Sequence, residues 1–133
     1  MKLFKALKTK NSFYTPKGKV SAKEILAGVI NNKNIFLLVD QKDSAGTEII
    51  FFGNKVKTQT GFLKIARKYN LKIVPMKNIR LPNNNLQITF EQPLLHNNNE
   101  VSDEKKMLEI NNIIEKWICL LYTSDAADEE DSV

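Results

Sequence analysis

Three stretches of the chain repeat apolar residues at the spacing of an amphipathic helix. The first covers residues 22–31, and Ser21 and Glu24 at its start have the spacing of a capping box. The second, about ten residues long, contains Phe62, Leu63, Ile65, Ala66 and Tyr69. The third spans residues 103–118. The pattern therefore predicts three helices that each turn one face toward a core.

Four short apolar runs predict strands between these helices. Ile35 to Val39 is apolar at every position, which is typical of a strand covered on both faces. Ile49 to Phe52 is a second run, Lys72 to Met76 contains a proline that favours a strand end or an edge, and Leu86 to Phe90 alternates like a half-buried strand. The order predicts an α/β fold, a mixed sheet with flanking helices, in one domain over residues 1–118.

The composition is that of an ordinary globular protein, with 42% hydrophobic and 26% charged residues. No apolar run approaches the roughly 20 residues that cross a bilayer. The net charge of +5 is uneven, because the first 80 residues carry 17 Lys and Arg against four acidic residues, a balance of +13. Such a surface attracts phosphates, nucleic acid, anionic lipid headgroups or an acidic protein.

The end of the chain changes character abruptly. Residues 119–129 resemble the translation of a sequencing adapter, and we expect the third helix to stop near Ile118. We therefore treat residues 119–133 as an artefactual acidic tail; as a genuine segment it would be a disordered terminus. The one cysteine, Cys119, lies in this tail, so no disulfide or thiolate metal site is expected.

The segment after the first predicted strand is the leading candidate for a binding loop, because ligands in α/β sheets collect beyond strand ends. Asp40, Gln41, Lys42 and Gly46 lie there. Lys42 can neutralise a phosphate, Asp40 can orient a donor, and a glycine at position 46 lets the backbone approach a ligand closely. A plain solvated loop is the alternative.

Two further segments could hold an anion. Lys55 to Gly61 leads into the second helix and includes Thr60, whose hydroxyl could contact a ligand or simply cap the helix. Lys77 and Arg80 follow the third predicted strand, and the Arg80 guanidinium suits a bidentate phosphate contact.

His96 is the only histidine, and it stands in an asparagine-rich loop where solvent exposure is the simpler interpretation. The spacing reveals no carboxylate pair, no metal-ligand cluster and no serine–histidine pair. The residues by themselves predict an anion-binding α/β surface with no cofactor.

Many small motifs occur together in one order, within a resemblance that covers about residues 14–118. They are Val39-Asp-Gln41, Gly46, Phe51-Phe-Gly53, Thr58-Gln-Thr-Gly61, Ala66, Ile73-Val-Pro75, Arg80-Leu-Pro82 and Pro93-Leu94. Together they resemble the C-terminal part of the bacterial lipid A biosynthesis acyltransferases, the lauroyl/myristoyl acyltransferase family. The resemblance implies part of a glycerolipid-acyltransferase-like domain. It also implies a substrate-binding role for Asp40, Gln41, Lys42, Gly46, Thr60, Lys77 and Arg80.

The resemblance implies transfer of a fatty acyl chain from acyl carrier protein to an anionic lipid A precursor, at the cytoplasmic face of the inner membrane. In that family a histidine, followed after four residues by Asp or Glu, deprotonates the acceptor hydroxyl. Here His96 is followed by Glu100 after only three residues, with Val101 in the acid's place. We therefore expect a fragment with no catalytic residue of its own, inactive alone.

Two other functions fit the positive charge. A basic nucleic-acid-binding module is the main alternative, although the chain lacks a recognition-helix pattern and an aromatic RNA-binding strand. A phosphate-dependent binding domain unrelated to acyl transfer is the other. The acyltransferase hypothesis expects no nucleic acid partner.

Overall fold

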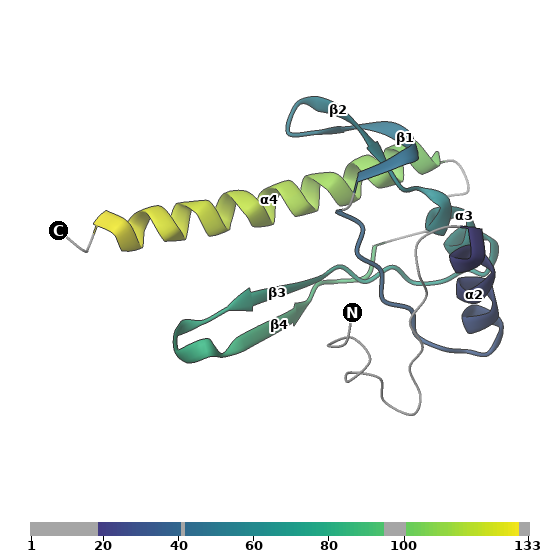
Figure 1. Ribbon diagram of the computed structural model, residues 1–133, viewed down its shortest axis with the longest axis horizontal. Helices are drawn as coiled ribbons and strands as arrows, with labels where there is room; N and C mark the ends of the chain where they lie inside the picture. The colour runs from purple at the N-terminus through teal and green to yellow at the C-terminus, as the bar shows by residue number, and fades with distance from the viewer. Residues whose placement is uncertain (1–18, 41, 95–100, 131–133) are drawn as a thin grey trace. The chain divides into compact units, whose positions relative to one another are not determined.

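The computed structural model describes residues 19–40, 42–94 and 101–130 (Figure 1). The chain divides into two units, residues 1–37 and 38–133, and each is described by itself. The α/β class is confirmed: the described residues form three α-helices and two small antiparallel sheets of two strands each.

The first unit contains helix α2, Lys19–Ile30. Its C-terminus is closed by the Lys33 N–H, which donates to the Gly28 carbonyl at 2.9 Å, while Asn32 takes a left-handed φ of 54°. The helix ends one residue before the predicted end at residue 31. The capping box is wrong, because α2 already includes Lys19, so Ser21 lies inside the helix rather than at its start.

The predicted strand from Ile35 to Val39 is wrong. These residues belong to no strand, and the Phe36 and Leu38 side chains are 72% and 73% exposed. A strand buried on both faces needs hydrogen-bonded neighbours at its edges, and none of the described strands pairs with this segment. The segment therefore has the composition of a central strand, but it belongs to neither of the described sheets.

The second unit begins with a hairpin of β1, Lys42–Phe51, and β2, Asn54–Thr58. Phe52 and Gly53 join them with φ angles of 47° and 73°, the left-handed pair that a tight hairpin turn requires. No strand was predicted at β2, most of which lies in the segment from Lys55 to Gly61 that leads into the second helix. β1 also extends through most of the predicted binding loop, where no strand was predicted.

Helix α3, Gly61–Lys68, matches the second predicted helix. It ends where Asn70 turns left-handed, with φ of 50°, and the Leu71 N–H donates to the Ala66 carbonyl at 2.8 Å. Tyr69, expected in the helix, is its C-terminal cap residue.

A second hairpin follows, made of β3, Met76–Arg80, and β4, Leu86–Phe90, joined through the short 3-10 helix η1, Pro82–Asn84. The prediction for β4 is confirmed. The prediction for β3 is wrong by four residues, since residues 72–76 were expected and Ile73 forms only an isolated bridge with Leu94. Because the connection through η1 is short, the residues just before it, 76–80, are the ones that pair with β4.

Helix α4, Asp103–Glu130, closes the chain. Ser102 caps it, because its hydroxyl accepts the Lys105 N–H at 3.3 Å. Hydrogen bonds from the backbone of Glu104 and from Ser102 lower the pKa of the Glu104 carboxyl. The predicted end near Ile118 is wrong: the helix continues to Glu130, over a segment that contains no glycine or proline to break it.

The core of the second unit joins three elements. Ile49 of β1, Leu63 of α3, and Met107 and Ile110 of α4 form one buried cluster, and Met107 is fully buried. A polar contact extends it, because the buried Asn111 amide donates to the Ile50 carbonyl at 3.0 Å. The prediction of the third helix as amphipathic is thereby confirmed for the face of α4 that packs against β1 and α3.

Arg67 fixes the start of α4 against α3. Its guanidinium contacts the Asp103 carboxylate at 2.6 Å and donates to the Val101 carbonyl at 2.9 Å. Within the described ranges, no helix is both long and apolar enough to cross a membrane.

Replacing Met107 with alanine should lower the free energy of unfolding by about 2–5 kcal/mol, because a fully buried side chain leaves a cavity. Asn112→Ala, at an exposed position of the same helix, is the control and should change it by less than about 0.5 kcal/mol. Urea unfolding followed by circular dichroism measures both. Equal stabilities for the two variants would contradict the assigned core.

Candidate functional site

The β1–β2 hairpin brings three of the predicted binding residues around one backbone position, Thr58. Thr58 is the register partner of both Lys42 and Thr47, so the four residues between them form a bulge. Gly46 lies in that bulge, and a Cβ on it would stand 2.4 Å from the Thr58 carbonyl oxygen. Thr60 reaches the same region, because its hydroxyl lies 3.2 Å from the Thr47 hydroxyl. We call Lys42, Gly46, Thr47, Lys57 and Thr60 the Thr58 cluster.

The bulge is held by polar contacts from both strands. The Asp43 carboxylate accepts the Ala45 N–H at 3.1 Å, which turns the backbone locally. Lys57 of β2 reaches across and places its Nζ 3.4 Å from the Ser44 carbonyl oxygen. The contact of Lys57 with the bulge was not predicted. Lys57 lies beside the bulge because it precedes Thr58 on β2.

The Thr58 cluster has the chemistry of an anion-binding surface. Lys42 and Lys57 supply positive charge, and Thr47 and Thr60 supply hydroxyls. Thr60 is also the residue before α3, and its side chain makes no capping hydrogen bond there. The expected alternative, that this hydroxyl is only a helix cap, is therefore wrong for Thr60.

The role of Gly46 differs from the expected one. The space above its Cα is filled by the Thr58 backbone, so the absent side chain is required by the pairing of β1 with β2. Direct contact between Gly46 and a ligand stays a prediction. Its effect in the structure is to let β1 and β2 approach closely at the bulge.

Lys77 and Arg80 do not share a surface. They stand three residues apart on β3, so their side chains leave opposite faces of the β3–β4 hairpin. Lys77 is half-buried and already engaged: its Nζ lies 3.5 Å from the Glu91 carboxylate and 5.5 Å from the centre of the Trp117 ring. Arg80 is exposed at the end of β3, opposite Leu86.

Of the remaining predicted residues, Asp40 is exposed just before β1, and Gln41 lies outside the described residues. His96 and Glu100 also lie outside them. The part of the chain that the structure describes holds no group of three or more His, Cys, Asp or Glu side chains arranged to bind a metal.

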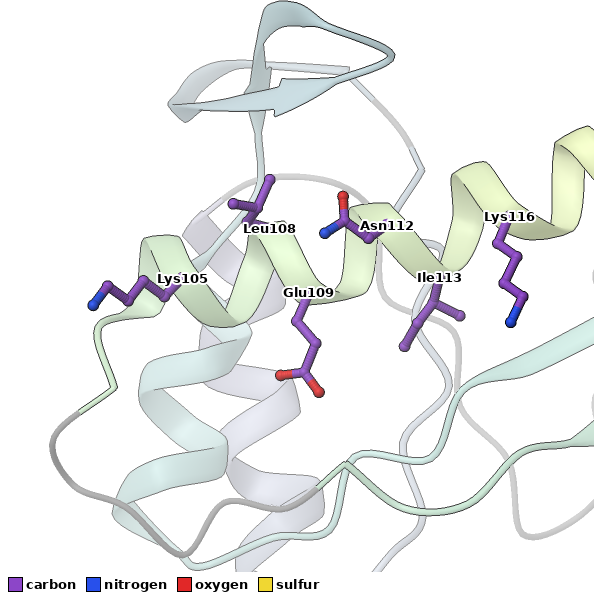
Figure 2. A pocket seen from close by; sticks show the side chains of 6 residues that line it. All are labelled: Lys105, Leu108, Glu109, Asn112, Ile113 and Lys116. Carbon is purple, nitrogen blue, oxygen red and sulfur yellow. The ribbon is translucent and has the colours of Figure 1, made fainter.

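A shallow groove of about 430 Å³ runs along α4. Figure 2 shows the side chains of Glu109, Ile113 and Lys116 on one side of the helix. Its lining comes entirely from α4 and includes none of the seven predicted binding residues; it consists of Lys105, Leu108, Glu109, Asn112, Ile113 and Lys116. The groove and the Thr58 cluster are therefore separate features.

A family model for bacterial lipid A biosynthesis acyltransferases matches residues 8–120. The chain belongs to that family. None of the curated proteins compared with the chain matches it. The match begins six residues before the resemblance seen in the sequence and ends two residues after it, so it stops at the start of the adapter-like segment.

Membership of the family supports an acyltransferase role in lipid A biosynthesis. A lipid A precursor is then the class of acyl acceptor, and an acyl donor is required. The family match favours this role over the nucleic-acid-binding and phosphate-dependent alternatives, which rested on positive charge alone.

Gly46→Ala should lower the free energy of unfolding by about 1–3 kcal/mol, because the new methyl group meets backbone that cannot move aside. Gly61→Ala is the matched control: nothing lies within 4 Å of the Cβ it would add. It should be neutral or slightly stabilising at the start of α3. Chemical denaturation measures both, and an unchanged Gly46→Ala variant would refute the close approach to Thr58.

Proposed function

We propose that this chain supplies the acceptor-binding part of a lipid A acyltransferase. The family match carries the proposal, and the Thr58 cluster supports it with paired lysines and hydroxyls around one bulge. Lys42, Thr60 and Arg80 contact the phosphorylated disaccharide of the acceptor, and Gly46 shapes the surface. Asp40 and Gln41 have the secondary role of orienting these groups, and Lys77 adds positive charge from the other face of the β3–β4 hairpin.

The electrostatics suit such an acceptor. The first 80 residues carry 17 basic side chains against four acidic ones, so a precursor with phosphate groups is attracted to this part of the chain. A lysine contributes a compact positive charge, whereas the guanidinium of Arg80 can hold two phosphate oxygens at once. The acceptor is thus bound by several charge-assisted hydrogen bonds.

Acyl carrier protein is the acyl donor in this proposal. It is an acidic protein, so the same positive field favours its approach. The acceptor hydroxyl loses its proton to a histidine backed by a carboxylate, its oxygen attacks the thioester carbonyl, and the carrier thiol leaves as the new ester forms. The reaction takes place at the cytoplasmic face of the inner membrane.

Arg80→Ala should weaken binding of a phosphorylated lipid A precursor by about tenfold or more, because a hydrogen-bonded charge contact is lost. Arg80→Lys should recover only part of the affinity, since a lysine cannot make the bidentate contact. Lys64→Ala, on the exposed face of α3, removes the same charge and should have little effect. Calorimetry in detergent micelles measures all three, and equal losses for Arg80→Ala and Lys64→Ala would reject the assignment.

The chain alone should transfer no acyl group, because its one histidine is not followed by an acid at the family's spacing. The test combines the purified chain with acyl-loaded carrier protein and lipid A precursor and follows product by mass spectrometry. His96→Ala is the control for a hidden base. Product formation that disappears in His96→Ala would show that the chain has its own catalytic residue.

A further inference from the structure

The turn of the β1–β2 hairpin begins with a residue that is poorly suited to it. Phe52 has a φ of 47°, in the left-handed region that an aromatic residue rarely adopts. The next two residues, Gly53 and Asn54, are a pair that commonly forms a two-residue hairpin turn, with the glycine in first place. The residue types therefore favour a different hairpin, in which the turn begins one residue later.

This alternative hairpin would keep the same inward and outward faces. In the observed register Ile49 lies opposite Val56. With the turn one residue later, Ile49 would lie opposite Thr58, which stands on the same side of β2 as Val56. Because the pairing moves by two residues, every side chain stays on its own side of the sheet. The hydrophobic pattern thus does not decide between the registers, and the turn favours the one that is not observed.

Two side chains of α4 bind β1 at the positions where the registers differ. The Glu115 carboxylate accepts the Phe52 N–H at 2.6 Å. The Asn111 amide donates to the Ile50 carbonyl at 3.0 Å. Asn111 and Glu115 are four residues apart on the helix, so they lie one turn apart on the same side of it. Together they contact two neighbouring backbone groups of β1.

Both contacts require the observed register. Opposite residues in an antiparallel pair alternate between hydrogen-bonded and non-hydrogen-bonded positions. The pair of Phe51 with Asn54 closes the turn and is hydrogen-bonded, so Ile50 is in the other kind of position and its carbonyl points away from β2. In the alternative register Phe52 would close the turn and Ile50 would become hydrogen-bonded. The Phe52 N–H and the Ile50 carbonyl would then turn toward β2, and both contacts with α4 would be lost.

The register also decides whether the Thr58 cluster is assembled. In the observed register Thr58 pairs with Lys42 and Thr47, and Lys57 reaches the Ser44 carbonyl. In the alternative register the residues of β2 would be displaced along β1 by two positions, about 7 Å. The lysines and hydroxyls on the two strands would then separate.

We infer that Glu115 is a positioning residue, whose hydrogen bond to the Phe52 N–H selects the register that assembles the Thr58 cluster. A hydrogen bond to a carboxylate is about twice as strong as one between neutral groups, and it offsets the unfavourable φ of Phe52. Asn111 adds the second contact. The selection of the register stands by itself, whereas its effect on acceptor binding rests on the proposed function.

Pairs of cysteines report the register. In a Cys119→Ser background, Glu48→Cys with Lys57→Cys joins residues that lie opposite each other in the observed register. Ile50→Cys with Lys57→Cys joins residues that lie opposite each other only in the alternative one. The equilibrium constant of each disulfide in a glutathione buffer measures how readily its register forms. Glu115→Ala should change the ratio of the two constants about tenfold toward the second pair, because a hydrogen bond to a charged group is lost.

Rescue variants separate register selection from a general loss of structure. Glu115→Gln keeps an acceptor oxygen and should stay within about threefold of the parent ratio. Phe52→Asn places Asn-Gly, the preferred pair, at the observed turn, and it should return Glu115→Ala to the parent ratio. Lys116→Ala, at an exposed position of α4, is the control and should change nothing. An unchanged ratio in Glu115→Ala, or a Phe52→Asn variant that fails to restore it, would overturn the inference.

The two disulfides also separate this inference from the proposed function. Each locks one register, and both proteins lack Lys57, so they are a matched pair. Calorimetry in detergent micelles should show that the protein locked by Glu48→Cys binds a phosphorylated lipid A precursor about tenfold more tightly. The reduced proteins are the control and should bind alike. Equal binding by the two locked proteins would reject the Thr58 cluster as the acceptor site and leave the register result standing. Tighter binding in the observed register, with no effect of Glu115→Ala on the ratio, would keep the acceptor site and reject the role of Glu115.

Discussion

The packing of α4 against β1 and α3 is the constraint on which the second unit depends. Met107 and Ile110 fill the space between Ile49 and Leu63, and each of these elements buries little else. The hydrophobic contribution is small in absolute terms, because only a handful of side chains are fully removed from water. The polar contact of Asn111 with the Ile50 carbonyl therefore matters, since it satisfies a buried amide while it joins helix to strand.

The order of helices and strands agrees with the predicted order only because β2, which was not predicted, makes up for the predicted strand from Ile35 to Val39, which is absent. Helices with a clear apolar period were located well, because that period reflects the face that packs. Strands were harder. Ile35 to Val39 has the composition of a central strand and pairs with none of the described strands, whereas β2 has alternating lysines and pairs with β1. Pairing depends on a partner elsewhere in the chain, and no local pattern encodes it.

In the candidate site, too, the sequence indicated the residue types but not how they are grouped in space. Lysines, a glycine and a threonine could be selected from the sequence, because their chemistry is visible there. Their grouping around Thr58 could not, since it follows from a bulge between Lys42 and Thr47 that only the register reveals. Conversely, Lys77 and Arg80 seemed to be a pair from their spacing, but the two-residue period of a strand separates them. Family membership supplies the class of acyl acceptor, which neither charge nor geometry specifies.

The two polar contacts of α4 also set its position along its own axis. Asp103 meets Arg67 at one end, and Asn111, eight residues later, meets the Ile50 carbonyl. Eight residues of helix measure about 12 Å, so α4 fixes the distance between its contact with α3 and its contact with β1 near the turn of the first hairpin. Inserting or deleting one residue between these contacts would turn the far half of the helix by about 100° and misalign Asn111 and Ile110 together. A change in chain length should therefore be tolerated after Trp117, beyond the contacts of Glu115 with the Phe52 N–H and of Trp117 with Lys77, and not between Asp103 and Asn111.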